Sequence, residues 1–380
     1  MVEMARELIK HPIDVTIENL GETVNSSYAD YYPFVNADGT EIIFTSRKRR
    51  KGSRLDIDGY YPSNIYSLTM DKGQPVKVNS LHNVNSSLDE RVVGFSKNGK
   101  KIFVYVDHDK YYGDLYYTQR GKSGVFMALK PMSEFINSPY VESSGSMSID
   151  EDTYFFASDR PGGYGGLDLY MVRKLPDGSW STPQNLGDKI NTPYNEDYPN
   201  LSYNNSTLHF SSEGHINMGG YDLFKSEWNS ESNEWTFPKN LGYPINTPDD
   251  NKMISFIEEE DIAYISLYKD GGFGDYDIYR ATFNNMSKKL SLLRMSLELD
   301  KENIISESTL DITNSETGEL YGTYISNQSS GIYTIILPPG EYEFFVEAEG
   351  YKPILKNYSI LSGDDFKEFI QDTLQLSINN

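Results

Sequence analysis

The sequence predicts an all-β protein: a five-bladed β-propeller followed by a small antiparallel β-sandwich. The first observation is a repeat, because the Asn of the motif INTP recurs at spacings of 60, 52, 54 and 55 residues, a period typical of repeat folds. The second is that every copy holds short apolar runs separated by Gly, Asp and Asn turns. The third is that residues 291–380 lack the repeat and alternate apolar with polar positions, as sandwich strands do. The repeat residues are Asn25, Asn85, Asn137, Asn191 and Asn246.

Each copy is predicted to form a four-stranded meander. Nineteen residues after each Asn lies an apolar run, such as YFFAS from Tyr154, which indicates a strand. A later strand begins with Asp and two apolar residues, as at Asp168. Such a sheet cannot bury both faces alone, so the copies are expected to pack radially around a channel. Aromatic residues eleven positions before a repeat Asn are expected to be buried between blades: Phe126, Trp180 and Trp235.

The ends of the repeat region predict how the ring closes. The last copy has no WxxPxNLG strand, whereas residues 13–21, IDVTIENLG, supply one ahead of the first Asn. We therefore expect residues 15–17 to pair beside residues 279–281. Residues 1–10 suggest a short helix that Pro12 ends, a remnant of a helical repeat domain. The predicted divisions are 1–13 for this segment, 14–283 for the propeller, 284–290 for a linker and 291–380 for the sandwich.

Composition limits the classes of partner. The net charge is −22, and nucleic acid or an anionic membrane surface would require a positive contact face. Protein or peptide partners fit better, and we expect no nucleic acid and no membrane insertion. The chain has no Cys, which removes thiolate chemistry. It shows no secretory signal and no apolar run of membrane-spanning length. Neither a cofactor nor a metal is expected.

A basic insertion in the first copy is one candidate binding site. Residues 47–54 hold six cations in an acidic chain. They could dock an acidic partner or phosphate, or they could be a solvated loop tip. Asp56 and Asp58, before Gly59, invite a calcium site, but a calcium loop needs six or more oxygen ligands and an ordinary turn also fits. The basic candidates are Arg47, Lys48, Arg49, Arg50, Lys51 and Arg54.

An acidic residue five positions after most of the repeat Asn residues is the second candidate. If this slot begins the innermost strand, the carboxylates gather near the channel mouth and attract a cation or a basic peptide. Alternatively, they accept backbone N–H bonds at a turn in every blade and are structural. The acidic candidates are Asp30, Glu90, Glu142 and Glu196, with Asn251 in the fifth copy.

Enzymatic interpretations have little support in the sequence. The glycine loops join strand to strand, so we attribute their glycines to turns with positive φ rather than to phosphate binding. No motif marks a nucleophile or a set of metal ligands. Five-bladed propellers include glycosidases, but these need carboxylates with distinct roles, whereas the candidates here repeat the same slot. We expect that the chain is not an enzyme; the alternative is a propeller that binds or hydrolyses glycans with its channel carboxylates.

The repeat units resemble a known family. SDRPGGYGGLDLY, WSTPQNLGDKINT and SSEGHINMGGYDLFKS resemble the TolB-like, WD-type propeller repeats of OmpA-family envelope proteins of Bacteroidota, over residues 14–283. NSETGELYGTYISNQSSGIYTIILPPGEYEFFVEAEGYKP resembles the carboxypeptidase regulatory-like domain, a transthyretin-like sandwich that usually follows this propeller.

The resemblance implies a periplasmic scaffold that binds proteins in the cell envelope. Family members often carry tetratricopeptide helices before the propeller and an OmpA-like peptidoglycan-binding domain after the sandwich. The PorE-type component of the type IX secretion and gliding apparatus shares this arrangement. Peptidoglycan is therefore an expected partner only of a chain that includes the OmpA-like domain.

Overall fold

The computed structural model describes residues 5, 8–10, 12–56, 58–108, 111–230, 232–257, 261–284, 291–299, 308–315, 317–327, 331–361, 367 and 369–378. Its contacts divide the chain into two units, Met1–Asn285 and Met286–Asn380. Of the predicted helix 1–10, residues 5 and 8–10 are described and are helical. Residues 285–290 of the predicted linker lie outside the described residues. No helix in the described part of the chain is long and apolar enough to cross a membrane.

The first unit consists of antiparallel sheets, five of them within the described residues, which we number in chain order. Sheet 1 contains β2 (Asp30–Val35), β3 (Glu41–Ser46), β4 (Asn64–Asp71) and β5 (Gln74–Ser80). Sheet 2 contains β6 (Asp89–Phe95), β7 (Lys101–His108), β8 (Tyr111–Gln119) and β9 (Lys130–Pro131). Sheet 3 contains β10 (Glu142–Met147), β11 (Thr153–Ser158), β12 (Asp168–Arg173) and β13 (Gln184–Asn185).

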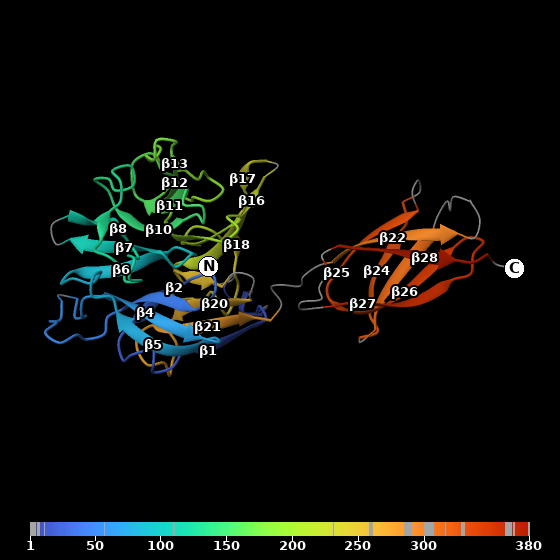
Figure 1. Cartoon of the computed structure of the whole chain (residues 1–380), viewed down its shortest axis with the longest axis horizontal. Helices are drawn as coiled ribbons and strands as arrows, with labels where there is room; N and C mark the ends of the chain where they lie inside the picture. Colours follow the sequence, from blue (N-terminus) through green and yellow to red (C-terminus); the bar gives the residue numbers. More distant parts are fainter. Residues whose placement is uncertain are drawn as a thin grey trace. The chain divides into compact units, whose positions relative to one another are not determined.

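Sheets 4 and 5 complete the described part of this unit. Sheet 4 contains β14 (Glu196–Leu201), β15 (Thr207–Ser212), β16 (Asp222–Asn229) and β17 (Glu234–Trp235), and β18 (Lys239–Asn240) also pairs with β16. Sheet 5 contains β19 (Ile254–Phe256), β20 (Ile262–Leu267), β21 (Asp277–Phe283) and β1 (Val15–Asn19). Figure 1 shows the sheets following one another around a common centre, in the colour order of the chain. This arrangement is that of a β-propeller.

The two ends of the repeat region meet in sheet 5, as the sequence predicts. Val15 lies opposite Phe283 and Ile17 opposite Ala281 in the antiparallel pair of β1 and β21. The inner strand β2 of sheet 1 also contacts β20 of sheet 5. The N-terminal strand therefore supplies the outer strand that the last copy lacks, and it covers an edge that would otherwise be unpaired.

The repeat Asn is a clamp between neighbouring sheets. Asn191 accepts a hydrogen bond from the Leu169 N–H at 2.8 Å and donates one to the Leu169 carbonyl at 3.0 Å. Asn25 makes the same pair of bonds with Ile278, across the two ends of the repeat region. Because the amide offers one acceptor and one donor side by side, it replaces a missing strand partner for a buried backbone. The same pairing joins Asn85 to Ile65, Asn137 to Leu115 and Asn246 to Leu223.

The aromatic slot of each copy is buried to different degrees. Phe126 is 3% exposed and Trp235 8% exposed, whereas Trp180 is half-buried against the core. The Trp235 ring lies edge-on to Phe155 of sheet 3, with centroids 6.0 Å apart. The prediction of burial therefore holds for Phe126 and Trp235, and Trp180 remains partly open to solvent.

The glycine loops are explained by close backbone approach as well as by turns. Gly162 has a φ of 94°, as a turn glycine should. Gly165 has no positive φ, but a Cβ there would lie 2.0 Å from the carbonyl oxygen of Tyr194 in the next copy. A Cβ at Gly274 would likewise lie 2.1 Å from the carbonyl oxygen of Tyr28. These two glycines therefore permit adjacent copies to pack, which turn chemistry alone did not predict.

The second unit contains two sheets that share one apolar core. One sheet has the order β24 (Leu320–Ile325), β23 (Ser308–Asn314), β26 (Gly340–Ala348) and β27 (Ile354–Ile360), and the other β25 (Ile332–Leu337), β22 (Ser291–Leu299) and β28 (Phe369–Leu376). Leu293, Phe344 and Leu374 from both sheets are buried together. The pair of β22 and β28 is parallel, which differs from the predicted all-antiparallel pattern. Parallel pairing is available because the chain between them is long enough to cross to the other sheet.

Candidate functional site

The predicted ring of carboxylates lies inside the sheets. Each accepts hydrogen bonds from the backbone N–H and the hydroxyl of the Ser or Thr that follows the repeat Asn. For Glu196 these are Thr192 N at 2.8 Å and Thr192 Oγ1 at 2.7 Å. The equivalent donors are Ser26 for Asp30, Ser86 for Glu90 and Ser138 for Glu142. All four carboxylate residues are at most 1% exposed. This geometry favours the structural alternative over contact with a ligand.

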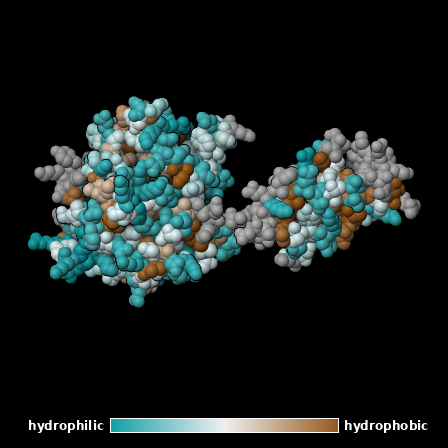
Figure 2. All heavy atoms as spheres, viewed as in Figure 1, coloured by the Kyte–Doolittle hydropathy of each residue, from teal (hydrophilic) through white to brown (hydrophobic). Residues whose placement is uncertain are grey.

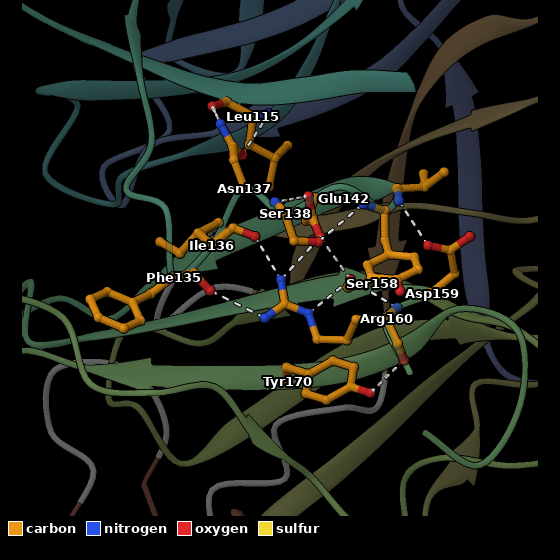
Figure 3. Close-up of polar contacts among 12 residues, drawn as sticks. Leu115, Phe135, Ile136, Asn137, Ser138, Glu142, Ser158, Asp159, Arg160 and Tyr170 are labelled. Carbon is orange, nitrogen blue, oxygen red and sulfur yellow. Dashed lines mark hydrogen bonds and ion pairs between the residues drawn. The ribbon is translucent and has the colours of Figure 1, made fainter. Parts of the chain in front are cut away.

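Glu142 is the centre of the most extensive of these networks (Figure 3). Arg160 Nη2 lies 3.0 Å from Glu142 Oε1 and also donates to the Ile136 carbonyl at 2.7 Å. Arg160 Nε donates to Ser158 Oγ, which in turn donates to Glu142 Oε1 at 2.8 Å. The buried charge pair is therefore satisfied on all sides within one sheet and its turn, which a buried ion pair requires.

Glu196 occupies the same slot in sheet 4 without a cation. His215 takes the place of Arg160, and its Nε2 lies 2.8 Å from the Ile190 carbonyl. Burial raises the pKa of Glu196 to about 7 although hydrogen bonds from Thr192 and Ser212 oppose the shift. Burial also lowers the pKa of His215, which favours the neutral imidazole. Glu196 therefore has a higher pKa folded than its ordinary 4.5, so its stabilising contribution is full below pH 4.5 and is lost as the pH rises through about 7.

The basic insertion, residues 47–63, joins β3 to β4 and is fixed at two of its arginines. Arg47 pairs with Asp58 at 3.1 Å and with Asp89 of sheet 2 at 3.6 Å. Arg50 Nη2 donates to the Ser86 carbonyl at 2.8 Å. Two of the six cations are thus half-buried and structural. The exposed ones are Lys48, Arg49, Lys51 and Arg54.

Two of the exposed cations, Lys51 and Arg54, line a cavity of about 430 Å³ together with the half-buried Arg50. Within the described residues, Lys51 and Arg54 form no ion pair with a carboxylate. The calcium candidate in the same loop is engaged otherwise, because Asp58 accepts from Arg47 and from the Tyr60 N–H at 2.9 Å. No group of three or more His, Asp or Glu residues that could hold a metal occurs in the described part of the chain.

A second cavity, of about 520 Å³, lies where the insertion meets sheets 1, 2 and 5. We call it the mouth pocket. Its aromatic lining consists of Tyr31, Tyr32, Tyr60, Tyr268 and Tyr276. Its cations are Arg47, Arg91 and Lys252, and its acids are Asp58, Asp249, Asp250 and Asp275. The pocket therefore combines tyrosine rings with charges of both signs, a lining that suits a polar ligand.

Two tyrosines have a strained backbone, and one of them, Tyr32, lines this pocket. Tyr32 has a φ of 55° and Tyr198 a φ of 51°, a conformation that is a clear outlier for a bulky residue. Both lie at irregularities of register, in β2 and β14. Their rings are 4.6 Å apart, although sheets 1 and 4 are not neighbours around the ring. The pair therefore crosses the centre of the propeller.

Sequence reasoning missed the mouth pocket. It identified the insertion correctly as a departure from the repeat. Arg47, the first residue of the insertion, also lines this pocket. Arg91 directly follows Glu90, and Lys252 directly follows Asn251. Nothing in this spacing distinguishes the two cations from other charged residues of the repeat. A usable signal was the Tyr-Pro pair in the inner strands of the first and fourth copies, at Tyr32 and Tyr198.

In Figure 2 the visible face of the first unit is mainly hydrophilic, with hydrophobic residues scattered singly.

Comparisons with known proteins show that the fold of this chain is similar to the folds of several solved structures. No known family and no curated protein matches the chain. Similar solved structures include TolB from Acinetobacter baumannii, at 15% identity and a TM-score of 0.42, covering 67% of this chain and 54% of that one. A glycoside hydrolase has 9% identity and a TM-score of 0.48, over 76% and 96% of the two chains. An α-L-arabinofuranosidase from Podospora anserina has 10% identity and a TM-score of 0.42, over 72% and 98%.

These comparisons correct one expectation. The sequence analysis predicted that the chain is not an enzyme, and that prediction is wrong as it stands, because the solved structures of similar fold include several glycoside hydrolases. The repetition of one carboxylate slot excluded only the buried ring of Asp30, Glu90, Glu142 and Glu196 as catalytic groups. It did not apply to acids outside that slot, and the mouth pocket contains four of them. The fold therefore leaves enzymatic activity open.

Proposed function

We propose that the chain is an interaction scaffold of the bacterial cell envelope, and that the basic insertion, residues 47–63, docks an acidic segment of a partner protein. The observation that carries this proposal is that two of the six cations hold the loop in place, whereas the other four are exposed. Arg47 and Arg50 are held by ion pairs and a carbonyl, whereas Lys48, Arg49, Lys51 and Arg54 are exposed on one loop. Loops fixed on a propeller are typical places for binding residues, and a positive patch on a chain of net charge −22 suits an acidic partner.

The sequence resemblance supports the finer parts of the proposal. We infer that the five described sheets are the complete set of blades, and that residues 291–380 are a transthyretin-like sandwich of the carboxypeptidase regulatory-like kind. The same resemblance favours an OmpA-family protein of Bacteroidota in the periplasm, associated with type IX secretion and gliding or with the link between outer membrane and peptidoglycan. Binding to peptidoglycan itself belongs to an OmpA-like domain and is not proposed for this chain.

The test is binding of an acidic probe by matched charge variants. The docking variant replaces four exposed loop cations with Ser: Lys48, Arg49, Lys51 and Arg54. The control replaces four exposed lysines elsewhere on the propeller, with the same change in net charge: Lys77, Lys100, Lys122 and Lys130. A ten-residue polyglutamate peptide and then envelope extract are offered at about 50 mM and about 150 mM salt, since exposed charges are screened over this range.

We expect the docking variant to lose both the peptide and the acidic envelope proteins, and the control to keep them. Capture by the wild-type chain should weaken at the higher salt concentration. Equal loss in both variants would show that only net charge matters. Unchanged capture by a folded docking variant would reject the loop as the docking site.

A second candidate function is binding or hydrolysis of a glycan in the mouth pocket. It is favoured by a specific observation: the exposed Asp249 and Asp275 lie in one cavity with five tyrosines, and glycosidases need a pair of carboxylates beside the sugar. The acids would be these residues rather than the buried ring that the sequence suggested. Release of reducing sugar from plant and bacterial polysaccharides by the wild type, lost in Asp249→Asn with Asp275→Asn, would establish it; no release by the wild type would reject hydrolysis.

A further inference from the structure

The mouth pocket contains a guanidinium without a carboxylate partner. Arg91, on β6, stacks on Tyr105 directly opposite on β7, with its Cζ 4.3 Å from the ring centroid. Within the described residues no Asp or Glu forms an ion pair with it. The other two cations of the pocket differ, because Arg47 pairs with Asp58 and Lys252 pairs with Asp250, both at 3.1 Å. Arg91 is therefore the cation that remains available for an anion.

The surroundings make this position suited to a ligand. Arg91 is half-buried and lines the same cavity as Tyr31 and Tyr32, so an anion there would leave water in part and meet the guanidinium at reduced dielectric. Tyr32 keeps a strained backbone at this point, and strain of this kind clusters where a chain binds or acts. The stacked Tyr105 ring orients the planar guanidinium, whose two N–H pairs match the two oxygens of a carboxylate.

The acids that remain unpaired in the pocket lie at exposed positions. Asp249 and Asp275 are exposed, and neither forms an ion pair within the described residues. A ligand that fills the pocket thus meets one free cation, which is half-buried, and two free anions at exposed positions. A peptide segment that ends in a free carboxylate and contains a basic side chain carries both signs of charge, whereas an acidic sugar carries only the negative one. This distribution favours a peptide over a glycan.

We propose that the mouth pocket binds the free carboxylate end of a short peptide segment at Arg91, with a basic side chain of that segment directed to Asp249 and Asp275. The proposal deepens the proposed scaffold function, because it gives the propeller a second contact with a protein partner beside the basic loop. The two contacts are separable: Lys48, Arg49, Lys51 and Arg54 do not line the mouth pocket.

The test uses the whole chain and calorimetric titration with two pools of tripeptides that have Lys in the middle. One pool ends in a free carboxylate and the other in a carboxamide. We expect the free-acid pool to bind at least about 10-fold more tightly, as a charge-assisted bidentate pair requires. Arg91→Gln should abolish the difference, and Arg91→Lys should keep part of it, because it retains the charge and loses the fork.

Control variants distinguish binding at Arg91 from a general effect of charge on affinity. Arg173→Gln makes the same substitution at an exposed arginine on β12 and should bind like the wild type. The exposed-lysine and loop variants of the docking test should keep the preference for the free acid. If Arg91→Gln does not fold, Asp249→Asn with Asp275→Asn replaces it, and a third pool is added that has Ala in the middle and a free carboxylate. The wild type should bind the Lys pool more tightly than this Ala pool, and the double variant should bind the two equally.

Several results would overturn the proposal. One is equal affinity for acid and amide pools, and another is an unchanged preference in Arg91→Gln. Binding of galacturonate or digalacturonate in place of the peptides would reassign the pocket to glycans. Absence of binding by every peptide up to about 10 mM, where even millimolar ligands are bound, would also reject it. Failure of this test leaves docking by residues 47–63 intact, since that is measured with polyglutamate and a different set of variants.

Discussion

Replacing Asn191 with Ala tests whether the repeat Asn holds adjacent sheets together. Asn191 is 1% exposed, and its amide makes both hydrogen bonds to the backbone of Leu169, which is 0% exposed. It also donates to Asn185 Oδ1 at 2.8 Å. The substitution removes these bonds and leaves the N–H and the carbonyl of Leu169 without their partner at a buried position.

The magnitude follows from the two backbone groups of Leu169. Each buried polar group that loses its partner costs about 1–3 kcal/mol, so the free energy of unfolding should fall by about 2–6 kcal/mol. That is a large part of the 5–15 kcal/mol typical of a folded domain. Asn25→Ala should cost a similar amount, because Asn25 makes the same pair of bonds with Ile278.

The assay is equilibrium unfolding in urea, followed by tryptophan fluorescence and by circular dichroism. Gln184→Ala is the matched control, since it removes an exposed amide from β13 in the sheet that Asn191 clamps. A loss for Asn191→Ala within about 0.5 kcal/mol of the control would refute the clamp, because that is the range of ordinary surface substitutions. A loss for Asn191 but none for Asn25 would show that the ends of the repeat region are joined less firmly than the copies.

Three further predictions concern burial, pH and the first strand. Trp235→Ala should cost about 3–5 kcal/mol and clearly more than Trp180→Ala, since Trp235 is 8% exposed and Trp180 half-buried; equal losses in urea unfolding would contradict this packing. Glu196→Gln should gain up to about 3 kcal/mol relative to the wild type between pH 4.5 and pH 7, because it removes a carboxyl whose pKa is raised to about 7; a difference that does not change with pH, from melts across this range, would disprove the shift. Deletion of residues 1–21 should leave the outer edge of β21 unpaired and cause aggregation in light scattering; a monomeric truncation of unchanged stability would show that β1 is dispensable.

The repeat made most of the first unit predictable. The spacing of the Asn residues located the sheets, and the missing last strand identified residues 13–21 as the partner of β21. The carboxylate slot could be placed at the start of the inner strands. Whether it faced a channel or its own turn could not be decided from the sequence, because both arrangements place the carboxylate at the start of the inner strand.

The mouth pocket could not be predicted from the sequence, for a different physical reason. Its residues come from three sheets and one insertion, and only the closed ring brings Arg91 near Tyr276 and Asp249. Repeat positions predict what all copies share, whereas the pocket depends on residues that differ between copies. The strained φ of Tyr32 likewise coincides with a register shift in β2 that no propensity indicates. In the second unit, the parallel pairing of β22 with β28 depends on which sheet each segment joins, and alternation alone does not specify it.

Hydrogen–deuterium exchange of the whole chain, with and without an acidic protein captured from envelope extract, tests the central claim most directly. The account predicts slower exchange on binding in residues 47–63, and in residues 266–276 if the partner also enters the mouth pocket. The docking variant should show neither change, and the exposed-lysine control should show both. Protection confined to β5, to β9 or to residues 308–361, with residues 47–63 unchanged, would contradict the assignment of the binding face.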